Sequence, residues 1–214
     1  MIYKYLLFIF VLYNLCISLF SAALGNNQTF KILAELDLKT KDISSIQSKF
    51  IQKKKISLFT KELTIEGMIY IKKPSLFTWH VYKPVRYGLV VKGSEISQWN
   101  ADTDSVKTIS MKNNPAFNAI FNHMNNWLSG NYKSLMDDYR VSVISEKPLS
   151  LSFAPLKSAA SSDLVANITI MFNEDLRYLN KITIGEKNGD KTTLSFLDTK
   201  LDKQIPLTAW SAKF

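Results

Sequence analysis

The stretch TIEGMIYIKKPSLFTWHVY, residues 64–82, decides the fold. In its first half, apolar and polar side chains alternate with the two-residue period of a strand. One face of this predicted strand carries three isoleucines: Ile65, Ile69 and Ile71. Gly67 stands between them on the same face. The pattern predicts a strand that is buried on at least one side.

A proline turn and a second strand follow. Proline at position 74 cannot donate to a β-ladder and favours a turn. Alternation then resumes and places three large apolar side chains on one face: Phe77, Trp79 and Val81. The opposite face carries Leu76, Thr78, His80 and Tyr82. Both faces thus hold large side chains, which indicates a strand covered on two sides.

The same alternation, punctuated by turn residues, continues through most of the chain. The predicted strands cover residues 46–71, 76–82, 87–92, 95–100, 106–109, 139–144, 149–154, 168–172, 179–185 and 192–197. Because many of them are apolar on both faces, a strongly bent sheet with helices on its concave side would bury them best. We predict an α+β, β-rich fold in which a strongly curved antiparallel sheet forms an incomplete, half-open barrel with a helical lid.

Three segments have helical spacing. Asn27 can cap a helix that carries Phe30, Leu33 and Ala34 and ends near Leu36 or Leu38. Asn131 can cap a short helix through Leu135 and Met136. The strongest apolar stripe comprises Phe117, Ile120, Phe121, Met124, Trp127 and Leu128. This stripe fits a core helix as well as a movable lid over an apolar cavity, and the pattern leaves both interpretations open.

The N-terminus has the layout of a secretory signal peptide. A positive start at Lys4 precedes an apolar run to Phe20 and a small-residue cleavage site. We predict a signal peptide at 1–23 and a single domain at 24–214, with an uncleaved membrane anchor as the alternative. The only cysteine, Cys16, lies in the leader, so the mature chain forms no disulfide. Export without disulfides fits the bacterial periplasm.

The net charge is +9, and removal of Lys4 with the leader leaves +8. This charge either keeps the protein soluble or attracts it to acidic surfaces such as lipid headgroups or an acidic protein. Nucleic acid is excluded as a partner because the chain is exported.

Groups with catalytic or metal-binding spacing are scarce. His80 and His123 have no metal-ligand spacing, and the sequence contains no Gly-x-Ser-x-Gly motif or glycine-rich phosphate loop. The adjacent Asp137 and Asp138 point to different faces of a helix, so a solvated surface explains them best. We expect no catalytic residues, no metal and no cofactor, and hence a protein that is not an enzyme. A hydrolase of unfamiliar design is the alternative.

Five segments resemble the outer-membrane lipoprotein carrier family (LolA-like). These segments are Phe-Ile-Gln-Lys at 50–53, the glycine-led strand, basic-Pro turn and Leu-Phe-Thr-Trp of 66–80, the hairpin at 87–100, the lid position at 117–128 and the hairpin at 185–196. The resemblance covers essentially the whole mature chain and is most specific at 50–99.

The resemblance implies an apolar cavity under a helical lid that receives the acyl chains of a lipoprotein. The cargo would come from an inner-membrane ABC-type release complex and pass to an outer-membrane acceptor. The carrier is expected to be a monomer. The implied lipid-binding residues are Ile69, Ile71, Phe77, Trp79, Val81, Phe117, Ile120, Phe121, Met124, Trp127 and Leu128.

Two features depart from the family pattern. Lys73 stands where the family has an arginine that latches the lid, and a lysine lacks the planar guanidinium fork. The hairpin at 92–97 reads Lys-Gly-Ser-Glu-Ile-Ser, so Trp99 comes two residues later than in the family. The alternative cargo is therefore an envelope lipid other than a lipoprotein. A single-domain regulator that senses lipid or lipoprotein is the second functional alternative.

Overall fold

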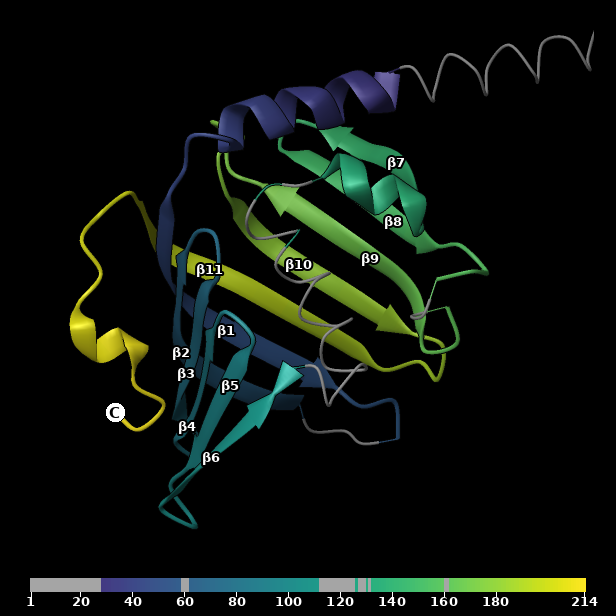
Figure 1. The fold of residues 1–214 in the computed structure, drawn as a ribbon. Coiled ribbons are helices and arrows are strands. Elements are labelled where there is room, and N and C mark those ends of the chain that lie inside the picture. The colour runs from purple at the N-terminus through teal and green to yellow at the C-terminus, as the bar shows by residue number, and fades with distance from the viewer. Residues whose placement is uncertain (1–27, 59–61, 112–125, 127–129, 131, 160–161) are drawn as a thin grey trace, which may run out of the picture.

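The computed structural model describes residues 28–58, 62–111, 126, 130, 132–159 and 162–214 (Figure 1). The N-terminal leader, the cap residue Asn27 and, apart from residue 126, the predicted helix at 117–128 lie outside the described residues. Within these ranges, eleven strands form one antiparallel sheet. They are β1 (Ser45–Lys55), β2 (Glu62–Lys72), β3 (Leu76–Lys83), β4 (Tyr87–Lys92), β5 (Glu95–Asn100), β6 (Ser105–Ser110), β7 (Tyr139–Glu146), β8 (Leu149–Pro155), β9 (Val165–Phe172), β10 (Leu179–Glu186) and β11 (Lys191–Leu201).

The sheet is an open, strongly curved layer (Figure 1). Its strand order is β6-β5-β4-β3-β2-β1-β11-β10-β9-β8-β7. Two meanders, β1 to β6 and β7 to β11, are joined by the antiparallel pairing of β1 with β11, in which Phe50 lies opposite Phe196. Because β6 and β7 are the two edges, the barrel is incomplete. The predicted fold class is confirmed.

The register of the β2–β3 hairpin follows from its alternation. Ile69 lies opposite Trp79 and Ile71 opposite Phe77, so these side chains share the concave face. Gly67 leaves space there for the Phe50 ring, since a Cβ at this position would lie 2.6 Å from Phe50 Cζ and overlap the carbonyl oxygen of His80. The glycine is therefore required by the close approach of three strands.

One apolar core fills the concave side of the sheet. It includes Phe50, Ile69, Phe77, Leu151, Phe153, Ile168, Ile170, Phe172 and Phe196 from the strands. A helix at 28–40 lies across one end of the sheet and adds the buried Leu33 and Leu36 (Figure 1). Tyr132 is also buried, and the centroid of its ring lies 5.2 Å from the centroid of the Phe172 ring.

Four local predictions needed correction. The strand predicted at 46–71 is two strands, because β1 ends at Lys55 and β2 begins at Glu62. The first helix extends to Thr40, whose Oγ1 donates to the Leu36 carbonyl at 2.8 Å. Phe30, expected on its apolar face, is exposed. The short 3₁₀ helix η2 (Lys133–Asp137) has Tyr132, not Asn131, at its N-cap.

The C-terminal segment packs on the convex face, an arrangement that sequence analysis did not predict. We call residues 207–214 the C-terminal strap; it begins with the 3₁₀ helix η3 (Leu207–Trp210). His80 Nε2 hydrogen-bonds the Ser211 carbonyl at 2.8 Å, and its ring stacks on Phe214 with centroids 3.9 Å apart. Burial lowers the pKa of His80. A Cβ at Gly88 would overlap the Ala212 carbonyl oxygen, so this glycine lets the strap lie directly on β4.

None of the helices within the described ranges is long and apolar enough to cross a membrane.

Candidate functional site

The concave face has two ends that differ in exposure. We call the end beside the helix at 28–40 the covered end; its inward side chains are buried and comprise Ile46, Ile71, Phe77 and Leu179. We call the opposite end the loop end; its inward side chains are half-buried and comprise Gln52, Lys54, Ile65, Ile184 and Leu194. Strand pairing places Gln52 between Ile65 and Leu194, so these three form one row across the sheet.

The sequence-predicted residues of β2 and β3 lie together on this face. Four of them are buried in the core: Ile69, Ile71, Phe77 and Val81. Trp79 is half-buried and stacks on Phe50, with ring centroids 3.9 Å apart and an interplanar angle of 30°. The remaining predicted residues, Phe117, Ile120, Phe121, Met124, Trp127 and Leu128, lie outside the described residues.

Lys73 contacts the helix at 28–40, and its predicted contact with the lid position at 117–128 lies outside the described residues. Its Nζ donates to the carbonyl oxygen of Thr40 at 3.1 Å, at the end of the helix at 28–40. Burial lowers the pKa of Lys73, and the carboxylates of Asp202 and Asp42 oppose this shift. Lys73 thus ties the β2–β3 turn to the N-terminal helix through a hydrogen bond.

The loop end carries an ion pair that sequence analysis missed. Lys54 Nζ lies 3.3 Å from Glu186 Oε1, and both side chains are partly buried. The two residues come from β1 and β10, and Thr192 of β11 lies opposite Lys54 between them. The two-residue period of β1 turns Phe50, Gln52 and Lys54 inward, so the sequence pattern could have indicated that Lys54 faces the concave side. No local pattern indicated its partner.

A narrow crevice lies at the covered end of the concave face, among the described residues. Its volume is about 10 Å³, which is room for at most one water molecule. It is lined by Ile46, Ser48, Ile69, Ile71, Tyr178, Leu179, Phe196 and Thr199. An acyl chain can enter here only if side chains or the covering helix move.

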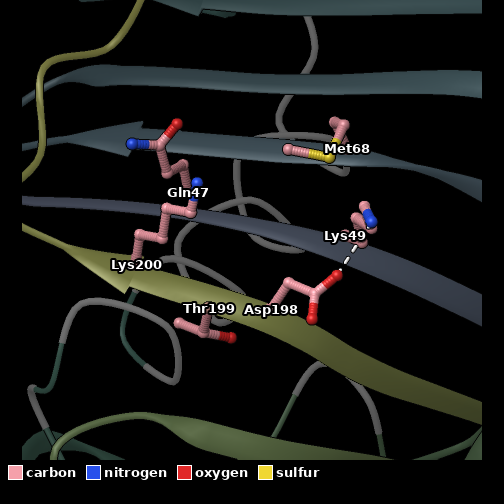
Figure 2. A pocket seen from close by; sticks show the side chains of 6 residues that line it. All are labelled: Gln47, Lys49, Met68, Asp198, Thr199 and Lys200. Carbon is pink, nitrogen blue, oxygen red and sulfur yellow. Dashed lines mark hydrogen bonds and ion pairs between the residues drawn. The ribbon is translucent and has the colours of Figure 1, made fainter.

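A larger hollow of about 420 Å³ lies on the convex side, over the register shift between β1 and β11 (Figure 2). It is lined by Gln47, Lys49, Met68, Asp198, Thr199 and Lys200. Lys49 Nζ lies 2.8 Å from Asp198 Oδ2, and this pairing lowers the pKa of Asp198. Because five of the six lining residues carry a polar or charged group, the hollow is a poorer match for an acyl chain than the apolar concave face.

Metal-binding groups are not concentrated in the described part of the chain. Across these residues, no three His, Cys, Asp or Glu side chains come close enough to hold a metal ion together. His80 is occupied by the C-terminal strap, and His123 lies outside the described residues.

Comparisons with known proteins agree with the architecture. The profile of the family described as "Outer membrane lipoprotein carrier protein LolA" matches residues 41–210. An outer-membrane lipoprotein carrier protein of Yersinia enterocolitica is 27% identical over 112 residues, which are 50% of this chain and 55% of that protein. The alignment thus spans little more than half the length of that relative.

Solved structures share the fold at low sequence identity. An uncharacterized conserved protein from Thermus thermophilus has a TM-score of 0.51 at 8% identity, with 85% of this chain and 96% of that chain covered. MucB in the Pseudomonas aeruginosa MucA/MucB complex has a TM-score of 0.50 at 10% identity, with 84% and 59% covered. The profile match includes the β2–β3 hairpin, Lys73 and all eleven strands. This chain belongs to the outer membrane lipoprotein carrier protein LolA family.

Proposed function

We propose that the protein is a periplasmic carrier that shields the acyl chains of lipoproteins, or of another envelope lipid, between the inner and outer membranes. One observation carries this proposal. Apolar side chains from β2, β3, β10 and β11 line most of the concave face, yet their burial decreases from the covered end to the loop end. A carrier needs apolar surface that a ligand can reach, and the half-buried aliphatic side chains of the loop end provide it.

The free energy of acyl-chain transfer favours an apolar binding site with few polar contacts. Transfer of a 16-carbon chain out of water is worth about 12 kcal/mol, at ~0.8 kcal/mol per methylene. A carrier has to match most of this and still release the chain to an acceptor. The aliphatic side chains of Ile65, Ile184 and Leu194 offer such nonspecific contact, without a catalytic group or cofactor.

Uptake beneath the helix at 28–40 requires an opening movement, because the crevice at the covered end holds at most one water molecule. The helix at 28–40 is the described element that covers the face, through Leu33 and Leu36. We propose that Lys73 is the latch of this cover through its bond to Thr40. A single hydrogen bond contributes about 1 kcal/mol, which is small enough for the cargo to overcome.

The direct test is lipid extraction and native mass spectrometry of protein purified from membranes. We expect wild type to carry acylated cargo and Leu194→Arg to lose it, because a guanidinium at the loop end opposes burial of an acyl chain. Val106→Arg is the matched control, since Val106 is 52% exposed and lies opposite Trp99, which faces the convex side. Absence of lipid from wild type, or equal loss in both variants, would contradict the proposal.

In the proposed route, the carrier receives its cargo from an inner-membrane ABC-type release complex and delivers it to an outer-membrane acceptor. The carrier itself is a monomer and is exported by a cleaved signal peptide at 1–23. Depletion of the protein should leave outer-membrane lipoproteins in the inner membrane. If lipoproteins reach the outer membrane normally and another lipid accumulates, that lipid is the cargo.

A second candidate is a regulator that binds lipid or lipoprotein and signals to a membrane-bound partner. The observation that favours it is the shared fold with MucB, which was solved in complex with MucA. The chain spans 59% of the MucB chain. Affinity purification from solubilised membranes separates the two candidates, because a regulator forms a stable complex with its partner and a carrier releases its cargo.

A further inference from the structure

Three loops meet at the loop end of the sheet (Figure 1). They follow β1, precede β9 and join β10 to β11. Ser57 Oγ donates to the carbonyl of Asn188 at 3.1 Å, and the Lys187 amide donates to the carbonyl of Leu164 at 2.9 Å. The Ser57 amide also donates to Asp190 Oδ1 at 2.8 Å and lowers the pKa of that carboxyl. The loops therefore form one connected tip.

Large apolar side chains project from this tip. Leu58 is 88% exposed, Leu164 is 71% exposed and Leu63, at the start of β2, is 46% exposed. A single exposed leucine is ordinary on a protein surface. Leu58 and Leu164 lie on loops that are hydrogen-bonded together, and Leu63 lies at the start of the adjoining strand. Such a group of exposed apolar side chains at one end is of the kind that marks an interaction site.

Positive charge surrounds the leucines. The exposed lysines of this end are Lys53, Lys55, Lys187 and Lys191, and the exposed acids are Glu62 and Asp163. Glu62 pairs with Lys53 at 3.3 Å, and Asp190 is buried against Ser57. The remaining lysines present long apolar stems with charged ends, which suit the boundary between acyl chains and phosphate groups.

We propose that the loop end docks directly on a lipid bilayer that contains anionic lipid. Leu58 and Leu164 enter the headgroup region, and the lysines contact lipid phosphates. Docking in this orientation sets the half-buried row of Ile65, Gln52 and Leu194 against the membrane surface. The inference goes beyond carriage, because docking needs neither cargo nor a protein acceptor.

The test is flotation of the full chain with vesicles of phosphatidylcholine that contain about one third phosphatidylglycerol. We expect Leu58→Asp/Leu164→Asp to lower vesicle binding at least about tenfold, since burial of one leucine is worth about that factor. Leu207→Asp is the matched control, because Leu207 is 89% exposed but belongs to the C-terminal strap. We expect Lys55→Glu/Lys187→Glu to weaken binding to the anionic vesicles and to leave binding to pure phosphatidylcholine unchanged.

Failure of docking is distinguishable from failure of the carrier proposal. The Leu58→Asp/Leu164→Asp protein should still contain lipid by native mass spectrometry. Three results would overturn docking: wild type that does not float with anionic vesicles, an equal loss in Leu207→Asp, or lipoprotein transfer in cells that is lost in the leucine variant while its vesicle binding is unchanged. The last result would assign the surface to a protein partner.

Discussion

The two ends of the concave face are built from the same strands but differ in packing. At the covered end, Ile71 and Phe77 lie opposite each other and are buried beside the N-terminal helix. At the loop end, Ile184 and Leu194 remain half-buried and share the surface with an ion pair. The comparison teaches that one face can be packed unevenly: the covered end is packed as core, and the loop end leaves apolar surface partly exposed.

The largest expected effect tests this difference with the same substitution at each end. Ile71→Ala should lower the free energy of unfolding by about 2–5 kcal/mol, because it leaves a cavity in a packed core. Ile184→Ala should lower it by less than about half as much, since water already reaches this side chain. Urea denaturation measures both values.

Lipid content should respond in the opposite order. Folded Ile71→Ala protein should still contain lipid, and Ile184→Ala protein should contain less of it by native mass spectrometry. Equal losses of stability at the two sites would mean that the ends do not differ in packing.

A substitution at Gly67, which lies between the two ends of the face, tests whether the tight packing of the covered end extends to the middle of the sheet. Gly67→Ala adds a methyl group that collides with the Phe50 ring and the His80 carbonyl, and we expect it to cost about 1–3 kcal/mol of unfolding free energy. Gly93→Asn is the control, because Gly93 has φ +59° and open space around it, and asparagine tolerates this conformation. If Gly67→Ala has the same melting temperature as wild type, the middle of the sheet can shift to accommodate the added methyl group at little cost.

Substitution of Lys73 tests what holds the helix at 28–40 on the covered end. Lys73→Met removes the bond to the Thr40 carbonyl but keeps much of the aliphatic stem, and we expect a loss of about 1 kcal/mol. Amide hydrogen exchange in the helix at 31–40 should become faster, while exchange in β9 should not change. Lys73→Arg should exchange like wild type. Unchanged exchange in Lys73→Met would mean that the other contacts of the helix, such as buried Leu33 and Leu36 and the Tyr132–Asp37 hydrogen bond, are enough to hold it.

Much of the sheet could be predicted from the sequence because alternation and turn residues are local signals. Residues 64–82 contain both, so the strands, the turn and the shared face of Phe77 and Trp79 were predicted. The break between β1 and β2 was not, since the residues around Ile56 and Leu58 carry no proline or glycine. Local patterns also give no information on pairing between β1 and β11, whose partners are about 150 residues apart.

The rest of the site depended on contacts between distant segments. Lys54 and Glu186 meet across β11, and Lys73 meets Thr40, so neither partner follows from spacing. The C-terminal strap had one usable signal: Gly88 interrupts an otherwise apolar strand, which is typical of a place where another backbone approaches closely.

The smallest effect concerns the ion pair of the loop end. Lys54→Met, Glu186→Met and the double variant form a double-mutant cycle, and we expect a coupling of about 0.2–1 kcal/mol because water screens this partly exposed pair. The double variant should be nearly as stable as wild type, since it replaces two compensated charges by apolar groups. It also makes the loop end chemically similar to the covered end, so it should bind lipid more tightly and release it more slowly to acceptor vesicles. If release is unchanged, the polarity of this end does not limit transfer, and the difference between the ends is one of packing alone.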